Sequence, residues 1–147
     1  MPNTATPKPA SLELKIDSDA ANIAAARHAL EAFANNHGFG DPIAAELGLC
    51  ANEALANVIR HAYLGASDRP ILIRAEILPA LPPATPELRV TIRDWGTGIN
   101  PAAQPRKPYD PLTPGGVGLI CLQKLMDDVI YTPQPDGMLL TITKRKC

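Results

Sequence analysis

Residues 52–61 read NEALANVIRH, and they place a carboxylate and an amide one helical turn apart. Glu53 and Asn57 are four positions apart, so on a helix their side chains are neighbours. Apolar residues recur at helical spacing on the opposite side of the same stretch. The pattern predicts an amphipathic helix from Pro42 to about Tyr63, with one buried face and one polar face.

The polar pair on this helix has two readings. A carboxylate can accept a proton from an attacking hydroxyl or water, which would make Glu53 a general base. An amide oxygen beside it is a hard ligand that suits Mg²⁺, so Asn57 could hold a metal. For an isolated Glu-x-x-x-Asn pair, a merely solvated helix face is the more frequent explanation.

A second motif, DWGTG, occupies residues 94–98. Apolar and polar residues alternate from Glu87 to Arg93, which predicts a strand that ends at Asp94. Gly96 and Gly98 permit close backbone approach or positive φ. A carboxylate there can accept a hydrogen bond from the exocyclic amine of adenine, whereas the structural alternative is a turn closed by Asp and Gly.

A third motif, GGVGL, occupies residues 115–119 and opens a helix-like stretch that reaches Asp127. It lacks the lysine of a P-loop and does not directly follow a strand, so neither the P-loop nor the dinucleotide-binding reading holds. Glycines at a helix start offer free N–H groups and the positive end of the helix dipole to phosphate. The alternative is a hinge that ends the proline-rich segment 97–114.

The remaining periodicities predict an α+β fold, a two-layer α/β sandwich whose mostly antiparallel sheet is covered on one face by three helices. The first helix follows a cap at one of residues 17–19 and ends near Gly38. Residues 1–10 read as a disordered lead, and residues 11–147 as a single domain. The strands are expected at residues 12–16, 71–78, 87–93, 129–132 and 138–143.

Composition sets modest limits on function. The chain has 147 residues, 46% of them hydrophobic, and a net charge of −1, which gives no general attraction to nucleic acid or to an anionic membrane. Its start lacks the layout of a signal peptide. Three scattered cysteines, at positions 50, 121 and 147, have neither zinc nor disulfide spacing. We therefore expect a cytoplasmic protein that binds neither nucleic acid nor membrane.

Taken in order, the three motifs resemble the N, G1 and G2 boxes of the GHKL (Bergerat-fold) ATPases. The likeness is strongest to the RsbW-type anti-sigma-factor serine kinases. Residues 53–63 resemble their Glu-x-x-x-Asn-Ala-x-x-His-x-Tyr helix, with Val58 where Ala is usual. Residues 94–98 match Asp-x-Gly-x-Gly, and residues 116–119 are similar to the glycine box. The likeness extends from Leu12 to Lys146.

The resemblance implies a role for each matched residue. Glu53 would activate a serine hydroxyl, and Asn57 would hold Mg²⁺ against the phosphates of ATP. Asp94 would bind the adenine amine, with Gly96 and Gly98 lining the base.

The resemblance also assigns the segments that follow. Residues 99–114 would form a lid, with Arg106 and Lys107 near the γ-phosphate. Met138 replaces a usual Thr in the last hairpin, so the water network around adenine is expected to differ. The phosphates would lie against Gly115, Gly116, Val117, Gly118 and Leu119.

The function implied is that of an ATP-dependent serine/threonine kinase and partner-switching regulator. Its substrate would be a STAS-domain antagonist, its second partner a sigma factor or similar target, and its assembly a homodimer. The alternative is a catalytically silent module that binds nucleotide and sequesters a partner. Glu53 favours the kinase, because a pure binder does not need a base.

Overall fold

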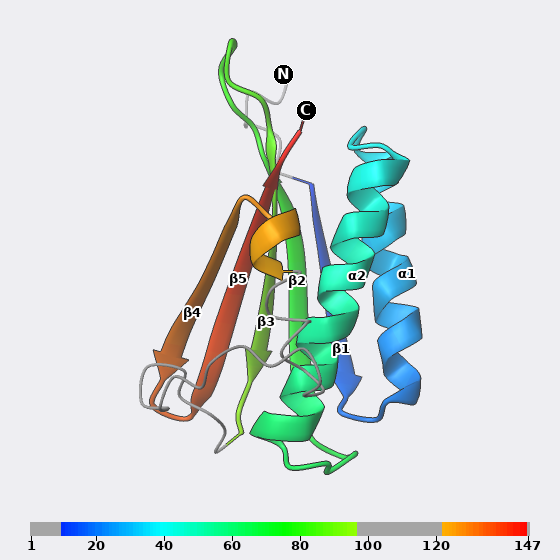
Figure 1. Ribbon diagram of the computed structural model, residues 1–147, viewed down its shortest axis with the longest axis vertical. Coiled ribbons are helices and arrows are strands. Elements are labelled where there is room, and N and C mark those ends of the chain that lie inside the picture. Colours follow the sequence, from blue (N-terminus) through cyan, green and yellow to red (C-terminus); the bar gives the residue numbers. More distant parts are fainter. Residues whose placement is uncertain (1–9, 97–121, 147) are drawn as a thin grey trace, which may run out of the picture.

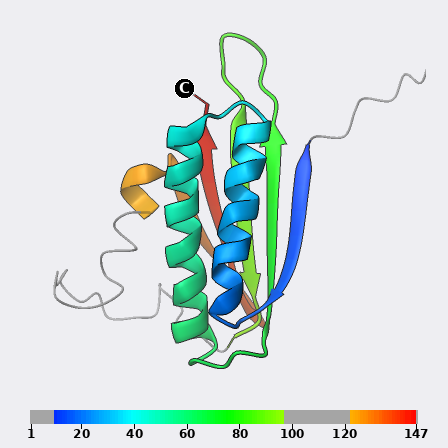
Figure 2. The same ribbon diagram turned by 90° about the vertical axis from the view of Figure 1, so that its right-hand side faces the viewer.

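The computed structural model describes residues 10–96 and 122–146. In these residues the chain forms an α+β sandwich of two layers, with an antiparallel sheet in the order β1-β2-β3-β5-β4 (Figure 1). Figure 2 shows α1 and α2 side by side on one face of that sheet, which confirms the predicted fold class. The elements are β1 Ser11–Asp17, α1 Ala21–Asn36, α2 Asp41–Asn57, η1 Val58–Ala62, β2 Pro70–Leu78, β3 Glu87–Asp94, β4 Asp128–Gln134 and β5 Gly137–Arg145.

Two helices differ in detail from the sequence prediction. The predicted helix 42–63 is α2 continued by the π-helical segment η1. A helical turn is present at residues 122–125, and the start of the helix predicted from residue 117 lies outside the described residues. The predicted disordered lead also lies outside them, except for Ala10.

The cap predicted for α1 at one of residues 17–19 is wrong, because the N-cap residue is Ala20. Ser18 is fully buried and has another role: its hydroxyl donates to the carbonyl of Ala66 at 2.5 Å and accepts the N–H of Arg69 at 3.0 Å. Asp19 accepts the Ala21 N–H at 2.9 Å without acting as the N-cap. Ser18 thus fixes the start of the first helix to the loop that precedes β2.

The core lies between the sheet and the two helices. Alternate residues of the central strands point inward, so Ile73, Ile92 and Leu140 form one row across β2, β3 and β5. Leu47 and Leu55 of α2 lie in the same buried cluster. Each such side chain contributes about 1.5–3 kcal/mol when it leaves water, so the apolar faces hold the layers together.

The inward alternation of β3 ends on a charged residue. Leu88, Val90 and Ile92 are buried, and the next inward position is Asp94, which is only 4% exposed. A carboxylate at a core position is costly unless it is hydrogen-bonded or used. Asp94 lies at one end of the sheet, and the 78–87 hairpin lies at the other end (Figure 1). The candidate site is at the Asp94 end.

Candidate functional site

Asp94 is a buried carboxylate that is only 4% exposed. Its Oδ1 accepts the N–H of Gly96 at 3.0 Å. Burial raises the pKa of Asp94 above its ordinary value of 3.8, and three weaker effects lower it: the Gly96 N–H, the charge of Arg93 and a backbone hydrogen bond with Met138. A carboxylate in such surroundings gains from a further donor. The role of Asp94 as acceptor for the adenine amine stays a prediction.

Gly96 lies directly against the end of the second helix. A Cβ at this position would overlap the backbone carbonyl of Ala62, the last residue of η1. Only glycine has the room for this approach. The absence of a side chain at Gly96 therefore lets the end of β3 and the end of η1 meet.

Tyr63 connects the same two ends through its hydroxyl. The side chain is buried, and its hydroxyl accepts the N–H of Trp95 at 2.8 Å and donates to the carbonyl of Pro70 at 2.5 Å. Burial is the main cause of the raised pKa of Tyr63, which keeps the hydroxyl protonated as a donor. One side chain thus joins the helix to β3 and β2 beside Asp94.

The helix that carries Glu53 and Asn57 changes its winding just before Tyr63. In η1 the N–H of Tyr63 reaches the carbonyl of Val58 at 3.0 Å, a five-residue spacing. Short π-helical segments are rare in proteins overall. Those that occur often lie at functional sites. Here the segment separates the polar pair from the tyrosine that ties the helix to the sheet.

Glu53 and Asn57 occupy the last turns of α2 and are half-buried. Their neighbours Ala54 and Leu55 are buried, which confirms the predicted division into a polar and an apolar face. The Oδ1 of Asn57 accepts a hydrogen bond from Arg60 Nη2 at 3.0 Å. Both polar side chains thus keep part of their surface open to a ligand.

The end of β3 is also supported from the face of the sheet away from the helices. Arg93 forms an ion pair with Asp136 in the β4–β5 turn and donates to the backbone carbonyl of Asp94. Its guanidinium lies 4.6 Å from the centre of the Trp95 ring, within the range of a cation–π contact. A Cβ on Gly137 would overlap the same Asp94 carbonyl. This support was not predicted from the sequence.

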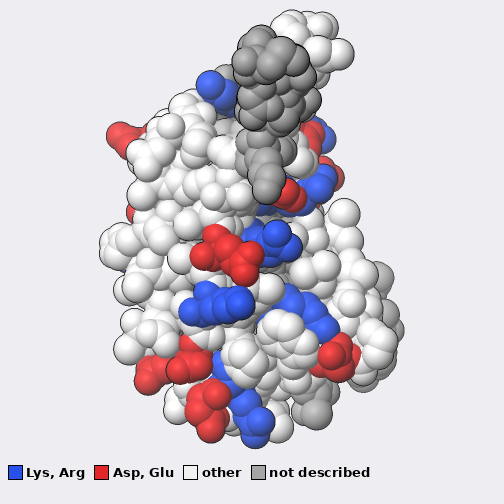
Figure 3. All heavy atoms as spheres, turned by 180° about the vertical axis from the view of Figure 1, so that it is seen from behind, with Lys and Arg blue, Asp and Glu red and all other residues white. Residues whose placement is uncertain are grey.

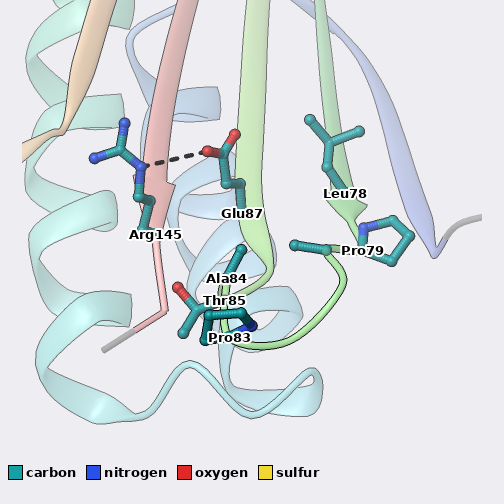
Figure 4. A pocket seen from close by; sticks show the side chains of 8 residues that line it. Leu78, Pro79, Pro83, Ala84, Thr85, Glu87 and Arg145 are labelled. Atoms are coloured by element: carbon teal, nitrogen blue, oxygen red, sulfur yellow. Dashed lines mark hydrogen bonds and ion pairs between the residues drawn. The ribbon is translucent and has the colours of Figure 1, made fainter.

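A separate cavity of about 470 Å³ lies at the other end of the sheet, between the 78–87 hairpin and Arg145 (Figure 4). Figure 4 shows Glu87 and Arg145 joined across it, and the Arg145 Nε lies 3.4 Å from the Glu87 Oε1. The cavity contains none of the motif residues. Because the buried carboxylate and the polar helix face lie elsewhere, we place the candidate site at Asp94 and not at this cavity.

Several predicted site residues cannot be placed. The second glycine of the DWGTG motif, the two cations at residues 106 and 107 and the glycine box lie outside the described residues, and their roles stay predictions. Those outside the described residues are Gly98, Arg106, Lys107, Gly115, Gly116, Val117, Gly118 and Leu119.

Two general features of the described residues bear on ligands. Within residues 10–96 and 122–146, no group of three or more His, Cys, Asp or Glu side chains is arranged to hold a metal ion. Within the same ranges, no helix has the length and apolar character that crossing a membrane requires.

Comparison with known proteins shows the family of this chain. The family described as "Histidine kinase-like ATPase domain" matches residues 16–144, which is most of the chain. The chain therefore belongs to this family, and the resemblance drawn from the three motifs is confirmed.

Among curated relatives, the chain is similar to the serine-protein kinase RsbW of Listeria monocytogenes, with 26% identity over 142 residues, covering 90% of this chain and 85% of the relative. The RsbW of Oceanobacillus iheyensis is also 26% identical, with 88% and 83% coverage. The anti-sigma F factor of Halalkalibacterium halodurans is 30% identical over 94 residues, which are 61% of this chain and 60% of that one.

A solved structure shares the fold at 18% identity. It contains the RsbU and RsbW domains of Rv1364c from Mycobacterium tuberculosis and superposes with a TM-score of 0.64 over 95% of this chain and 33% of that one. The chain thus spans about one third of that protein.

Proposed function

We propose that the protein is an ATP-dependent serine kinase that phosphorylates a STAS-domain antagonist and switches between this substrate and a sigma factor or similar target. The proposal depends chiefly on one observation. The helix with the Glu53–Asn57 pair is tied, through Tyr63 and Gly96, to the strand end at the buried Asp94. A base, a metal ligand and an adenine acceptor are thereby carried on two connected elements.

The residues present fit ATP and Mg²⁺. Asp94 is buried, so an adenine amine would supply a further donor that the carboxylate can use. Asn57 offers a single hard oxygen, which suits Mg²⁺ because this ion keeps several waters and phosphate oxygens in its shell. That oxygen would exchange its hydrogen bond with Arg60 for the metal.

ATP with Mg²⁺ would supply the γ-phosphoryl group and the charge that stabilises its transfer. Asp94 would orient the nucleotide by accepting from the base, and Gly96 would leave room beside it. Glu53 would accept the proton of the substrate hydroxyl as it attacks. Such a site works mainly by positioning and electrostatic stabilisation.

The second candidate is a module that binds nucleotide and partner without phosphate transfer. The half-buried, partly open Glu53 favours the kinase, because pure binding does not require a carboxylate at that position. By likeness to the relatives, we also propose that the protein acts in the cytoplasm and as a homodimer.

The decisive experiment incubates the protein with Mg²⁺, labelled ATP and the STAS protein encoded nearest to it. We expect label on a serine of that partner. Glu53→Ala should abolish the transfer while the affinity for ADP, measured by calorimetry, stays within about twofold. Asp94→Asn should instead weaken the binding of ADP itself.

Three results would contradict the proposal in different ways. Transfer by Glu53→Ala at the wild-type rate would exclude Glu53 as the base. Unchanged ADP affinity in Asp94→Asn would exclude its role at adenine. Tight ADP binding without transfer to any STAS protein would favour the sequestering module.

A further inference from the structure

Arg93 holds Asp94 by its main-chain carbonyl rather than by its carboxylate. Successive residues of a strand point to opposite faces of the sheet, so Asp94 faces the helices and Arg93 faces the other side. From there the Arg93 Nη1 donates a hydrogen bond to the Asp94 carbonyl. The guanidinium therefore fixes the backbone that carries the carboxylate and does not compete with a ligand for it.

The turn between β4 and β5 completes this contact. The Arg93 Nη2 forms an ion pair with the Oδ1 of Asp136 in that turn. A Cβ on Gly137 would overlap both the Asp94 carbonyl and the Arg93 Nη1. The carbonyl of Asp94 is thus enclosed by the guanidinium on one side and by the backbone of the turn on the other.

Trp95, the residue after Asp94, is also held by Arg93. The guanidinium lies 4.6 Å from the centre of the Trp95 ring, and the Trp95 N–H donates to the Tyr63 hydroxyl at 2.8 Å. The Arg93 side chain is only 17% exposed, so it has little freedom to take other positions. Because Asp94 lies between two residues that contact each other, a displacement of Arg93 should displace the Asp94 backbone as well.

The surroundings favour a local effect over a general electrostatic one. Figure 3, which shows the molecule from behind, displays acidic and basic side chains interleaved rather than separated by sign. Arg89 is on the same face of β3 and lies opposite Thr143, about 13 Å along the strand from Arg93. The charge of Arg93 also lowers the pKa of Asp94, against the larger and opposite effect of burial. Contact and charge at Arg93 thus act on the same carboxylate.

We propose that Arg93, anchored by Asp136, is a positioning residue of the nucleotide site that fixes the Asp94 carboxylate where it meets the exocyclic amine of adenine. The proposal rests on the adenine role of Asp94 in the proposed function. It adds the residue that makes this role selective. It does not depend on phosphate transfer.

The main measurement is the preference for ADP over inosine diphosphate, determined by calorimetry. Inosine diphosphate carries a carbonyl oxygen where ADP carries the amine. A carboxylate in the right place accepts a hydrogen bond from the amine and repels the oxygen. We therefore expect the wild type to bind ADP more tightly than inosine diphosphate by about tenfold or more.

Arg93→Met is the main variant, because it removes both polar contacts and keeps an apolar stem of similar length. Its affinity for ADP should fall by about tenfold, while its affinity for inosine diphosphate stays within about twofold of the wild type. A variant that only loosened the pocket would lose affinity for both nucleotides and keep the preference.

Asp136→Ala provides a second variant at a side chain that is 63% exposed. It removes the anchor of Arg93 and leaves the guanidinium in place, so the preference for ADP should fall by a smaller factor. The double variant should lose no more preference than Arg93→Met alone, because the two residues act as one unit. Thermal unfolding of each variant confirms that the protein is folded, and Asp136→Ala carries the test if Arg93→Met does not fold.

Arg89→Met is the matched control. It makes the same substitution and the same change in net charge on the same strand and face, at a position that lies opposite Thr143. Its affinities for ADP and for inosine diphosphate should both equal those of the wild type.

The possible outcomes are distinct. A wild type that binds both nucleotides equally, or neither, overturns the adenine role of Asp94 and this inference with it. If the wild type prefers ADP and folded Arg93→Met keeps that preference, the positioning role of Arg93 is overturned and the role of Asp94 stands. A double variant whose loss equals the combined losses of the two single variants overturns the anchoring by Asp136.

Discussion

Asp94 stands where the pattern of β3 would otherwise place an apolar side chain. Its carboxylate is 4% exposed and accepts the Gly96 N–H. Burial raises its pKa, so in the folded protein the proton is held more tightly than in the unfolded chain. The ionised form, which the proposed contact with a nucleotide base requires, is thus kept at some cost in stability.

This cost predicts a pH dependence. The stabilising effect of the Asp94 proton is complete below the ordinary pKa of 3.8 and is lost as pH rises through the higher folded-state pKa. Asp94→Asn does not titrate. The free energy of unfolding of the nucleotide-free wild type should therefore fall relative to this variant as pH rises from about 4 to about 7.

Urea denaturation of both proteins across this range provides the measurement. The difference between their unfolding free energies is the informative quantity, because other titrating groups are common to both. Two parallel pH profiles would show that the Asp94 pKa is the same in the folded and unfolded states.

Gly96 gives a second prediction at the level of one residue. Gly96→Ala would push a Cβ into the carbonyl of Ala62, and such overpacking costs about 1–3 kcal/mol. Because the shift separates β3 from η1, ADP affinity should fall as well. Gly65→Ala is the control: its φ of +85° makes it strained, but nothing lies within 4 Å of the added Cβ, so it should lose stability without losing affinity.

Among the elements, the link from the helix to the sheet depends on the Tyr63 hydroxyl. Tyr63→Phe leaves the N–H of Trp95 and the carbonyl of Pro70 without this partner. Both hydrogen bonds are part-buried, so their loss should cost about 1 kcal/mol, near the lower end of the range for groups left unpaired. We expect that loss of stability together with weaker ADP binding, measured by thermal unfolding and calorimetry.

Tyr131→Phe supplies the comparison for this experiment. Tyr131 lies on β4, is half-buried, and has a pKa raised by burial. Its hydroxyl takes no part in the bridge between helix and sheet. If both variants lose the same affinity for ADP, the Tyr63 bridge does not position the site.

The elements that could be predicted from sequence are those with a clear local period. The strand ending at Asp94 and the polar face of Glu53 and Asn57 follow from alternation and helical spacing, and the structure has both. The contacts of Arg93 with Asp136 could not be predicted, because they depend on the pairing of β3 with β5 across more than forty residues.

The helix ends were the least predictable part. Nothing in the local sequence distinguishes the π-helical winding of η1 from a regular continuation of α2. Likewise Ser18 has the composition of a helix cap, yet its hydroxyl bonds to the loop at Ala66 and Arg69. For Ser18, a tertiary contact thus outweighs the local preference for a helix cap.

Across the whole molecule, the sheet separates two ends with different content. One end carries Asp94, and the other carries the 78–87 hairpin with its cavity (Figure 1). Replacing residues 80–85 with a short glycine-containing turn should therefore leave ADP affinity within about twofold, measured by calorimetry. A large loss of affinity would show that the two ends are coupled through the sheet.

Strand direction also brings the end of β1 to the end of the sheet that carries Asp94. Asp17, at the end of β1, lies opposite Pro70, one step from the Ile71–Asp94 pair. The loop between β1 and α1, which Ser18 ties to Ala66 and Arg69, therefore lies at the same end of the sheet as Asp94. A change in this loop is expected to act close to the candidate site, although the two are more than seventy residues apart in the sequence.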